Sequence, residues 1–194
     1  MKSSSLIRRS GQRSEGQIIV VAALGIVSMI GMAALVLEGG NAYAQQRVVQ
    51  NGADAAANAG AVVLAQRLGG LSKTDDDVLA AVTTVAAGNN LTSFVGRYTD
   101  VSGQLIDNSG APVGSPASAA VVGPGDGLSS IPPNAQGVAL DGSRAFPTFI
   151  GRAIGFNSFT GSANATAVTE MRDLAAATPP ETRARAETFM VKVY

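Results

Sequence analysis

Carboxylates are the side chains on which any catalytic chemistry of this sequence would depend. The 194 residues include no His, no Cys and no Trp, so an imidazole base, a thiol nucleophile and the usual ligands of zinc are absent. Asp100, Asp107 and Asp141 stand at predicted strand-end turns, where paired acids could act on a glycosidic bond. Clefts of that kind use aromatic platforms, and only 5% of this chain is aromatic. We therefore expect a protein that is not an enzyme and has no small-molecule substrate.

The densest group of acids is the run from Asp75 to Asp77, which directly follows Thr74. No further oxygen ligands follow at the spacing of a calcium loop. A threonine N-cap with an acid three residues later is instead typical of a capping box, and acids in the first turn face the positive end of the helix dipole. The run predicts a helix that continues to about Ala87, and we assign no metal site and no cofactor.

Charge and hydropathy point away from nucleic acid and toward a membrane. The 14 basic and 14 acidic residues cancel to zero formal net charge, so nothing suggests a nucleic-acid partner. Charged residues make up only 14% of the chain, well below the fraction typical of soluble domains. Part of the chain therefore avoids water.

Residues 18–37 form an apolar run that matches the length of a membrane-spanning helix. Its twenty residues carry no charge, and at about 1.5 Å per residue they cover the roughly 30 Å of a hydrocarbon core. Eleven of them are Ile, Val or Leu, which gives an insertion free energy of about −3 to −7 kcal/mol. By the positive-inside rule, the basic tail at 1–17 stays in the cytoplasm and everything after the span is exported. The predicted membrane-boundary residues are Arg8, Arg9, Arg13 and Glu38.

Two kinds of processing remain open at this N-terminus. Ala42-Tyr43-Ala44 has the small-x-small form that signal peptidase accepts, and cleavage there would give a secreted or surface-anchored adhesin or binding module. The apolar run is longer than the roughly 7 to 15 residues usual for a signal peptide, which favours a retained anchor. Prepilin cleavage after Gly16 is the third interpretation, although Val21 stands where pilins usually carry Glu.

A helical period continues beyond the apolar run. The segment 38–70 is rich in Ala and Gln, and small or β-branched residues recur in it every three or four positions. Gly69 and Gly70 are typical of a helix end. The stripe suits either the later strands of the same chain or a helix of another subunit, because small residues permit close approach in both cases. It consists of Val49, Ala53, Ala56, Gly60 and Val63.

Residues 71–194 predict an exported head, which with the long helix gives an α+β fold with a few antiparallel strands and short helices. The segment 158–171 alternates in polarity, and its nearly all-small inner face predicts close packing against the long N-terminal helix. Other elements are expected as two short strands at 94–106, a strand at 137–140, a short buried helix at 146–155 and an edge strand at 189–194.

The segment 108–137 differs from the rest of the head in composition. Gly, Pro, Ser and Ala supply 21 of its 30 residues. Such a segment is expected to bury too little apolar surface to order itself. We therefore predict a flexible surface loop.

The N-terminal part of the chain resembles a known family. Residues 16–61 combine a Gly-Gln lead, the apolar span, Glu38, Tyr43 five residues later, and a Gln-Asn-x-Ala-Asp-Ala-Ala-Ala run at 50–57. This combination resembles the N-terminal segment of TadG-like proteins of the tight-adherence (Flp) pilus system. The later segment 144–168 is similar to a Pro-Thr-Phe, Gly, Phe-Thr, Ala-Thr-Ala pattern in the same exported proteins.

The resemblance implies a pilin-like fold and a single-pass minor component or assembly factor of a pilus-like secretion system in a bacterial cytoplasmic (inner) membrane. Its partners would be membrane lipid and other pilus or secretion-system subunits. Larger members of that family append a von Willebrand A domain with an Asp-x-Ser-x-Ser metal motif. Asp107 and Ser109 come near this motif, but Ala111 replaces the last hydroxyl ligand, so we expect a turn there.

Overall fold

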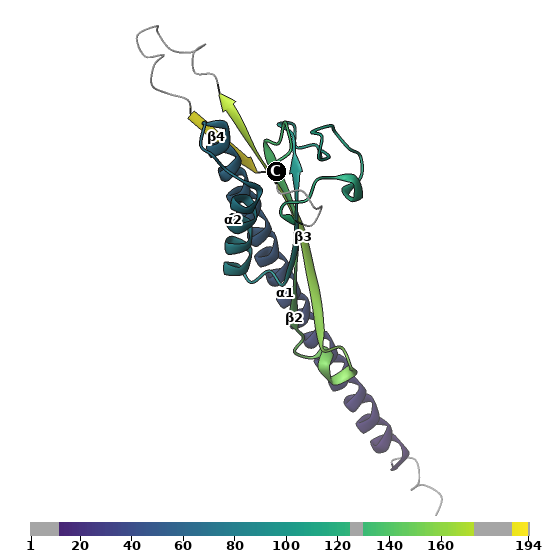
Figure 1. The fold of residues 1–194 in the computed structure, drawn as a ribbon. Coiled ribbons are helices and arrows are strands. Elements are labelled where there is room, and N and C mark those ends of the chain that lie inside the picture. Colours follow the sequence, from purple (N-terminus) through teal and green to yellow (C-terminus); the bar gives the residue numbers. More distant parts are fainter. Residues whose placement is uncertain (1–11, 125–129, 173–187, 194) are drawn as a thin grey trace, which may run out of the picture.

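A long helix packed against a four-stranded antiparallel sheet forms the body of the protein (Figure 1). This computed structural model describes residues 12–124, 130–172 and 188–193. Helices come first and strands follow, so the predicted α+β class is confirmed. In chain order the elements are α1 (Gln12–Leu68), α2 (Asp75–Gly88), β1 (Ser93–Thr99), the 3₁₀ turn η1 (Pro116–Ser118), β2 (Gly137–Pro147), the 3₁₀ turn η3 (Gly151–Ile154), β3 (Ser158–Arg172) and β4 (Thr188–Val193).

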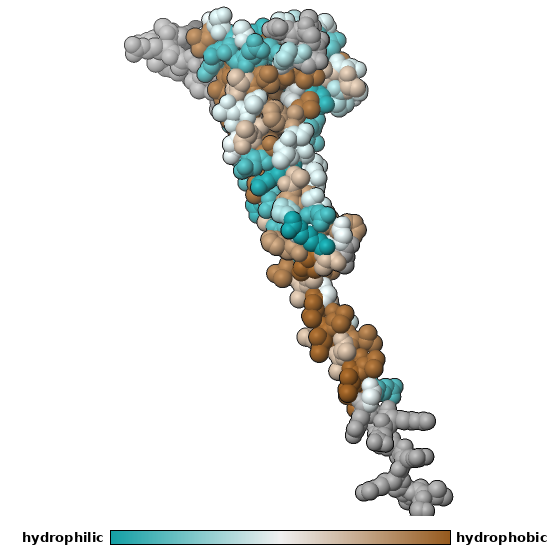
Figure 2. Space-filling view, turned by 60° about the horizontal axis from the view of Figure 1, so that its bottom comes forward, coloured by the Kyte–Doolittle hydropathy of each residue, from teal (hydrophilic) through white to brown (hydrophobic). Residues whose placement is uncertain are grey.

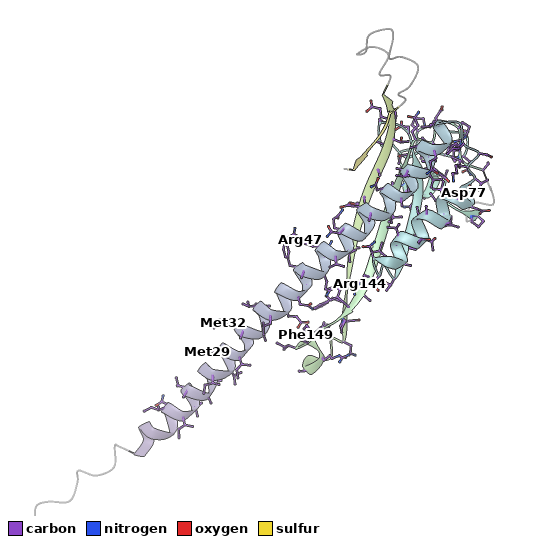
Figure 3. All side chains as sticks on the ribbon, turned by 90° about the vertical axis from the view of Figure 1, so that its left-hand side faces the viewer. Met29, Met32, Arg47, Asp77, Arg144 and Phe149 are labelled. Carbon is purple, nitrogen blue, oxygen red and sulfur yellow. The ribbon has the colours of Figure 1, made fainter. Side chains whose placement is uncertain are left out.

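Helix α1 runs without interruption through Gly39 and Gly40, so the apolar run and the helical extension form one rod (Figures 1 and 3). The helix ends at Leu68, as the glycine pair after it predicts. Gly70 has a φ of +90°, a left-handed conformation that glycine adopts without strain, and the chain turns away from the helix axis there.

The start of α2 is the predicted capping box. The Thr74 hydroxyl accepts a hydrogen bond from the Asp77 amide at 3.3 Å, and the Asp77 carboxylate accepts one from the Thr74 amide at 2.8 Å. The backbone bond from Thr74, followed by the bond from its hydroxyl, lowers the pKa of Asp77 below its ordinary value. These contacts explain the acid run as a helix cap.

The sheet has the strand order β1-β2-β3-β4, with every pair antiparallel. Strands β2 and β3 form a long hairpin in register from Gly137 with Val168 down to Pro147 with Ser158. Helix α1 lies along this hairpin, and a Cβ on Gly161 would lie 3.4 Å from Cγ2 of Val49. The predicted packing of a small-residue strand face against the long helix is confirmed, and β4 is an edge strand as expected.

The segment 108–137 packs more closely than its composition predicts. The stretch near Ala120 pairs with the outer edge of β1: the Tyr98 amide donates to the Ala120 carbonyl and the Val122 amide to the Gly96 carbonyl, both at 2.9 Å. The composition of this segment did not indicate this packing. A few apolar residues are enough to cover a strand edge, because the backbone groups of that edge need hydrogen-bond partners. Residues 125–129 lie outside the described part. The core residues from this segment are Ala120, Val122, Ile131 and Ala135.

The prediction of a buried helix at 146–155 is wrong. Strand β2 continues through Pro147, and only Gly151–Ile154 forms a 3₁₀ turn. Phe149 is 73% exposed and Ile150 is exposed as well. The hairpin tip reaches past β1 and α2 and has only α1 beside it, so an apolar helical face there would find no second surface (Figures 1 and 3).

Candidate membrane anchor and packing surfaces of the long helix

The first candidate surface is the N-terminal part of α1, which projects beyond the end of the β2–β3 hairpin (Figures 1 and 3). The large apolar side chains from Ile18 to Leu37 are between 59% and 74% exposed. Figure 2 shows this projecting part as hydrophobic surface. By length and composition the helix is able to cross a membrane. An uncovered helix that is apolar on all sides is typical of a membrane span.

Glu38 marks the point where α1 meets the head. Its Oε2 accepts hydrogen bonds from the backbone amides of Phe149 and Ile150, each at 3.1 Å. A carboxylate that accepts two N–H groups makes charge-assisted bonds. Glu38 therefore ties the hairpin tip to α1 directly after the last residue of the apolar run. Of the other predicted boundary residues, Arg8 and Arg9 lie outside the described part and Arg13 lies in the first turn of α1.

The second candidate surface is the small-residue stripe, which lies inside the head. All five of its residues are buried. The fit is closest at Gly60, where a Cβ would lie 2.8 Å from Cγ2 of Val138 in β2 and 3.0 Å from Cγ2 of Val82 in α2. Glycine is the only residue that this spacing accepts without movement of its neighbours. The stripe thus faces elements of its own chain, one of the two partners that the sequence allows.

The buried face of α1 is wider than the stripe. Ala57, Ala61 and Leu64 are fully buried as well. Sequence reasoning followed one residue per turn and missed this second row, although a repeat of four from Ala53 through Ala57 to Ala61 was readable. A buried face of two rows is wide enough to cover a sheet, whereas contact with a single partner helix needs only a narrow stripe.

Two glutamines extend the contact between α1 and β3. Nε2 of Gln46 donates to the carbonyl of Ser162 at 2.6 Å, and Nε2 of Gln50 donates to the carbonyl of Asn164 at 3.1 Å. Both carbonyls lie on the part of β3 that β4 does not cover. The glutamines therefore satisfy backbone groups that would otherwise need water. No local sequence pattern indicates this role, because it depends on where β3 lies.

Asp75 forms a buried polar contact within the core. The Tyr98 hydroxyl donates to its Oδ1, and the Gly123 amide donates to Oδ1 at 3.0 Å and to Oδ2 at 2.9 Å. The carboxylate joins the start of α2 to β1 and to the segment 108–137. The sequence identified Asp75 only as an acid of the first helical turn, whereas its partners come from 23 and 48 residues away.

Asp107 accepts hydrogen bonds within its own turn. Its Oδ1 receives the Ser109 hydroxyl at 2.6 Å and the amides of Ser109 and Ala111 at 2.9 and 3.0 Å. The Ser109 hydroxyl, then the Ala111 amide, lowers the pKa of Asp107 below its ordinary value. The predicted turn at this position is confirmed.

The other two acids considered for catalysis are also engaged. Asp100 forms a similar turn; burial alone would raise its pKa, but hydrogen bonds from Ser102 and from the Gln104 amide outweigh this and lower it. Asp141 forms an ion pair with Arg97. Within the described residues, no three His, Cys, Asp or Glu side chains gather as metal ligands.

Helix α1 contains the segment of the chain that is similar to a known protein family. Residues 16–64 match the family Tad, described as "putative Flp pilus-assembly TadE/G-like". The likeness to this family is limited to that segment of α1. The recognition of a TadG-like N-terminal segment is therefore confirmed, and it supports involvement in Flp pilus assembly. The Tad match spans both the exposed apolar run and the buried stripe. No curated protein and no solved structure matches the chain.

Proposed function

We propose that the protein is a non-catalytic, pilin-like minor component or assembly factor of a tight-adherence (Flp) pilus or a related secretion system. In this proposal residues 1–17 form a cytoplasmic tail and residues 18–37 cross the bacterial cytoplasmic membrane once. The helical extension 38–70 and the head 71–194 lie outside. The observation that carries the proposal is that one Tad segment both exposes an apolar run of membrane length and is built into the core of a folded head.

The proposal of a membrane anchor is supported by the apolar surroundings that residues 18–37 require. Burial of apolar surface contributes about 25 cal/mol per Å², and the eleven Ile, Val and Leu residues of the exposed run forgo most of that gain in water. A bilayer provides the missing apolar surroundings along the whole length of the run. The basic residues before the run support this direction across the membrane.

Small residues in the run give other subunits a place to approach. A Cβ at Gly25 or Gly31 would have no atom within 4 Å. Glycine in a membrane helix lets a second helix come close to the backbone. We therefore place contact with other pilus or secretion-system subunits on the span, since the stripe is already occupied by the head.

A role without catalysis is supported by what the acids do. Asp100 and Asp107 hold turns, Asp141 pairs with an arginine and Asp75 is buried in the core. None of these carboxylates is left to act as a proton donor toward a substrate. Contact with lipid and with other subunits is then the function that the surfaces favour.

Topology is tested with the full chain in the native bacterium, using a C-terminal tag. Carbonate extraction should leave the protein in the membrane fraction, and protease added to intact spheroplasts should remove the tag. Release by carbonate would exclude an integral anchor, and a protected tag would reverse the orientation. The mass of the mature N-terminus separates the alternatives, because cleavage after Ala44 would favour the secreted adhesin.

Participation in a pilus is tested by deleting the gene and counting Flp pili by electron microscopy. Loss of pili, with recovery on expression of the wild-type chain, is the expected result. Normal piliation in the deletion strain would contradict the assembly role. Expression of a chain that lacks residues 18–37 should not restore pili, because the deletion removes the segment that anchors the head and directs its export.

A further inference from the structure

The tip of the β2–β3 hairpin, residues 147–157, displays aromatic side chains that no other described element covers. Phe149 is 73% exposed and Phe156 is 60% exposed, and Ile150 and Phe159 beside them are exposed too. Two of the six phenylalanines in the chain lie in the tip, and Phe159 lies two residues beyond it. Scattered exposed apolar residues are normal on a protein surface, but a cluster of this kind marks a contact surface.

The tip is internally fixed, so the exposure does not come from an unformed loop. The Thr148 hydroxyl donates to the Phe156 carbonyl, and the Phe156 amide donates to the Gly151 carbonyl at 2.9 Å. Gly155 closes η3 with a φ of +92°, in the left-handed region that suits glycine. The turn that carries Phe149 and Phe156 is therefore held by its own hydrogen bonds.

The position of the tip along α1 indicates which layer of the membrane lies next to it. Glu38 holds the amides of Phe149 and Ile150 at 3.1 Å, and Glu38 directly follows the apolar run. Figure 3 shows Phe149 beside α1 between the levels of Met32 and Arg47. When residues 18–37 lie in the hydrocarbon core, the tip must lie at the boundary between acyl chains and headgroups.

Residue types at the tip suit that boundary. Aromatic side chains concentrate at membrane interfaces, and the exposed Tyr43 adds another at nearly the same level of α1. The part of the hairpin from 142 to 169 contains Arg144 and Arg152 and no acid. Arginine near the surface is attracted to anionic headgroups and can extend its guanidinium toward them.

We propose that the hairpin tip inserts Phe149 and Phe156 into the interfacial layer of the outer leaflet, as a second contact with the bilayer that α1 crosses. This inference rests on the anchor of the proposed function. The hydrogen bonds to Glu38 set the depth of the tip in the membrane. The span of α1 and the hairpin tip together fix the tilt of the head against the bilayer.

The test uses the full chain with one tryptophan, because the natural sequence has none. Phe149→Trp is reconstituted in vesicles of phosphatidylcholine and phosphatidylglycerol, with bromine placed either shallow or deep in the acyl chains. We expect emission shifted to shorter wavelength and quenched more strongly by shallow bromine than by deep bromine. Phe156→Trp repeats the measurement in case the first substitution disturbs the tip.

Two reference positions separate this inference from the anchor. Met29→Trp in the apolar run should be quenched most by deep bromine, and Leu71→Trp at the opposite end of the head should not be quenched. If Met29→Trp responds and both tip variants behave like Leu71→Trp, the tip contact is overturned and the anchor stands. A blue shift without quenching by bromine would mean that a second copy covers the tip, which also overturns the proposal. Failure of Met29→Trp as well would overturn the anchor itself.

Discussion

Residues 18–37 and 49–65 belong to one continuous helix, yet they expose opposite kinds of side chain. In the first region, large apolar side chains point outward, and those from Ile18 to Leu37 are at least 59% exposed. In the second, most of the Val, Leu, Ala and Gly residues are buried, while Asn51, Asn58 and Val62 face outward. The backbone is helical in both regions, but the side chains and the protein surfaces that cover them differ.

The difference shows that the hydrophobic content of a helix does not by itself say what covers it. The second region has smaller apolar residues than the first and is nevertheless the one in the core, because small side chains let the sheet approach closely. The first region has the larger apolar area and no protein partner among the described residues. A water-soluble protein would bury the larger area first. The arrangement therefore favours a membrane around the first region.

The largest expected effect comes from a charge in the exposed region. Replacing an isoleucine by aspartate at the centre of a span costs about 3 to 4 kcal/mol of insertion free energy, a large share of the gain estimated for the run. Ile26→Asp should therefore lose carbonate resistance, while the thermal midpoint of the head in detergent stays unchanged. Leu71→Asp, on the head, is the control and should keep full carbonate resistance. Unchanged membrane association of Ile26→Asp would contradict the conclusion that a membrane surrounds the exposed region.

The second prediction sets two glycines of α1 against each other. Gly60→Leu forces a side chain against Val138 and Val82 and should destabilise the head by about 1 to 3 kcal/mol through overpacking. Gly31→Leu in the exposed region meets no atom within 4 Å and should leave the head unaffected, with a gain in helix propensity of about 0.8 kcal/mol. Urea unfolding of the full chain in detergent measures both.

Asn58→Leu controls for a general effect of leucine on this part of the helix. Asn58 is exposed, so its substitution should change stability by less than about 0.5 kcal/mol. Equal stability of the Gly60, Gly31 and Asn58 variants would show that the stripe does not pack.

The third prediction compares two valines. Val49 is fully buried against β3, and Val49→Ala should cost roughly 1.5 kcal/mol from lost burial and the cavity that remains. Val27 lies in the exposed region, and Val27→Ala should leave the unfolding free energy of the head unchanged. The same measurement applies, and a loss at Val27 as large as at Val49 would mean that protein covers both regions.

Periodicity and caps predicted the parts of the fold that depend on local sequence. The end of α1 at Leu68, the capping box at Thr74 and the small inner face of β3 each follow from residues within a few positions of one another. Their physical causes are local, because backbone hydrogen bonds and side-chain alternation act between near neighbours.

Long-range contacts account for what the sequence could not predict. The segment 108–137 becomes part of the core only because β1 offers it an unpaired edge. Phe149 lies on an exposed turn because the hairpin extends past the other elements, which no local pattern indicates. The Glu38 contact joins residues more than a hundred positions apart and was equally invisible, although Glu38 itself was selected as a boundary residue.

The smallest expected effect concerns Glu38, which lies at the junction of the two regions. Glu38→Gln keeps an acceptor oxygen near the amides of Phe149 and Ile150 but removes the charge that strengthens both bonds. The head should lose no more than about 0.5 to 1.5 kcal/mol, because the loss is limited to the difference between charged and neutral acceptors at a partly exposed site.

Hydrogen exchange locates this change better than global unfolding does. In Glu38→Gln the amides of Phe149 and Ile150 should exchange faster, while the Tyr98 amide, bonded to Ala120 in the core, keeps its protection. Glu38→Ala should increase the exchange further, since it leaves both amides without an acceptor. If neither variant alters exchange at the tip, the hairpin is held by the β2–β3 ladder alone. The boundary between the two regions of α1 would then have to be set by the lipid and not by Glu38.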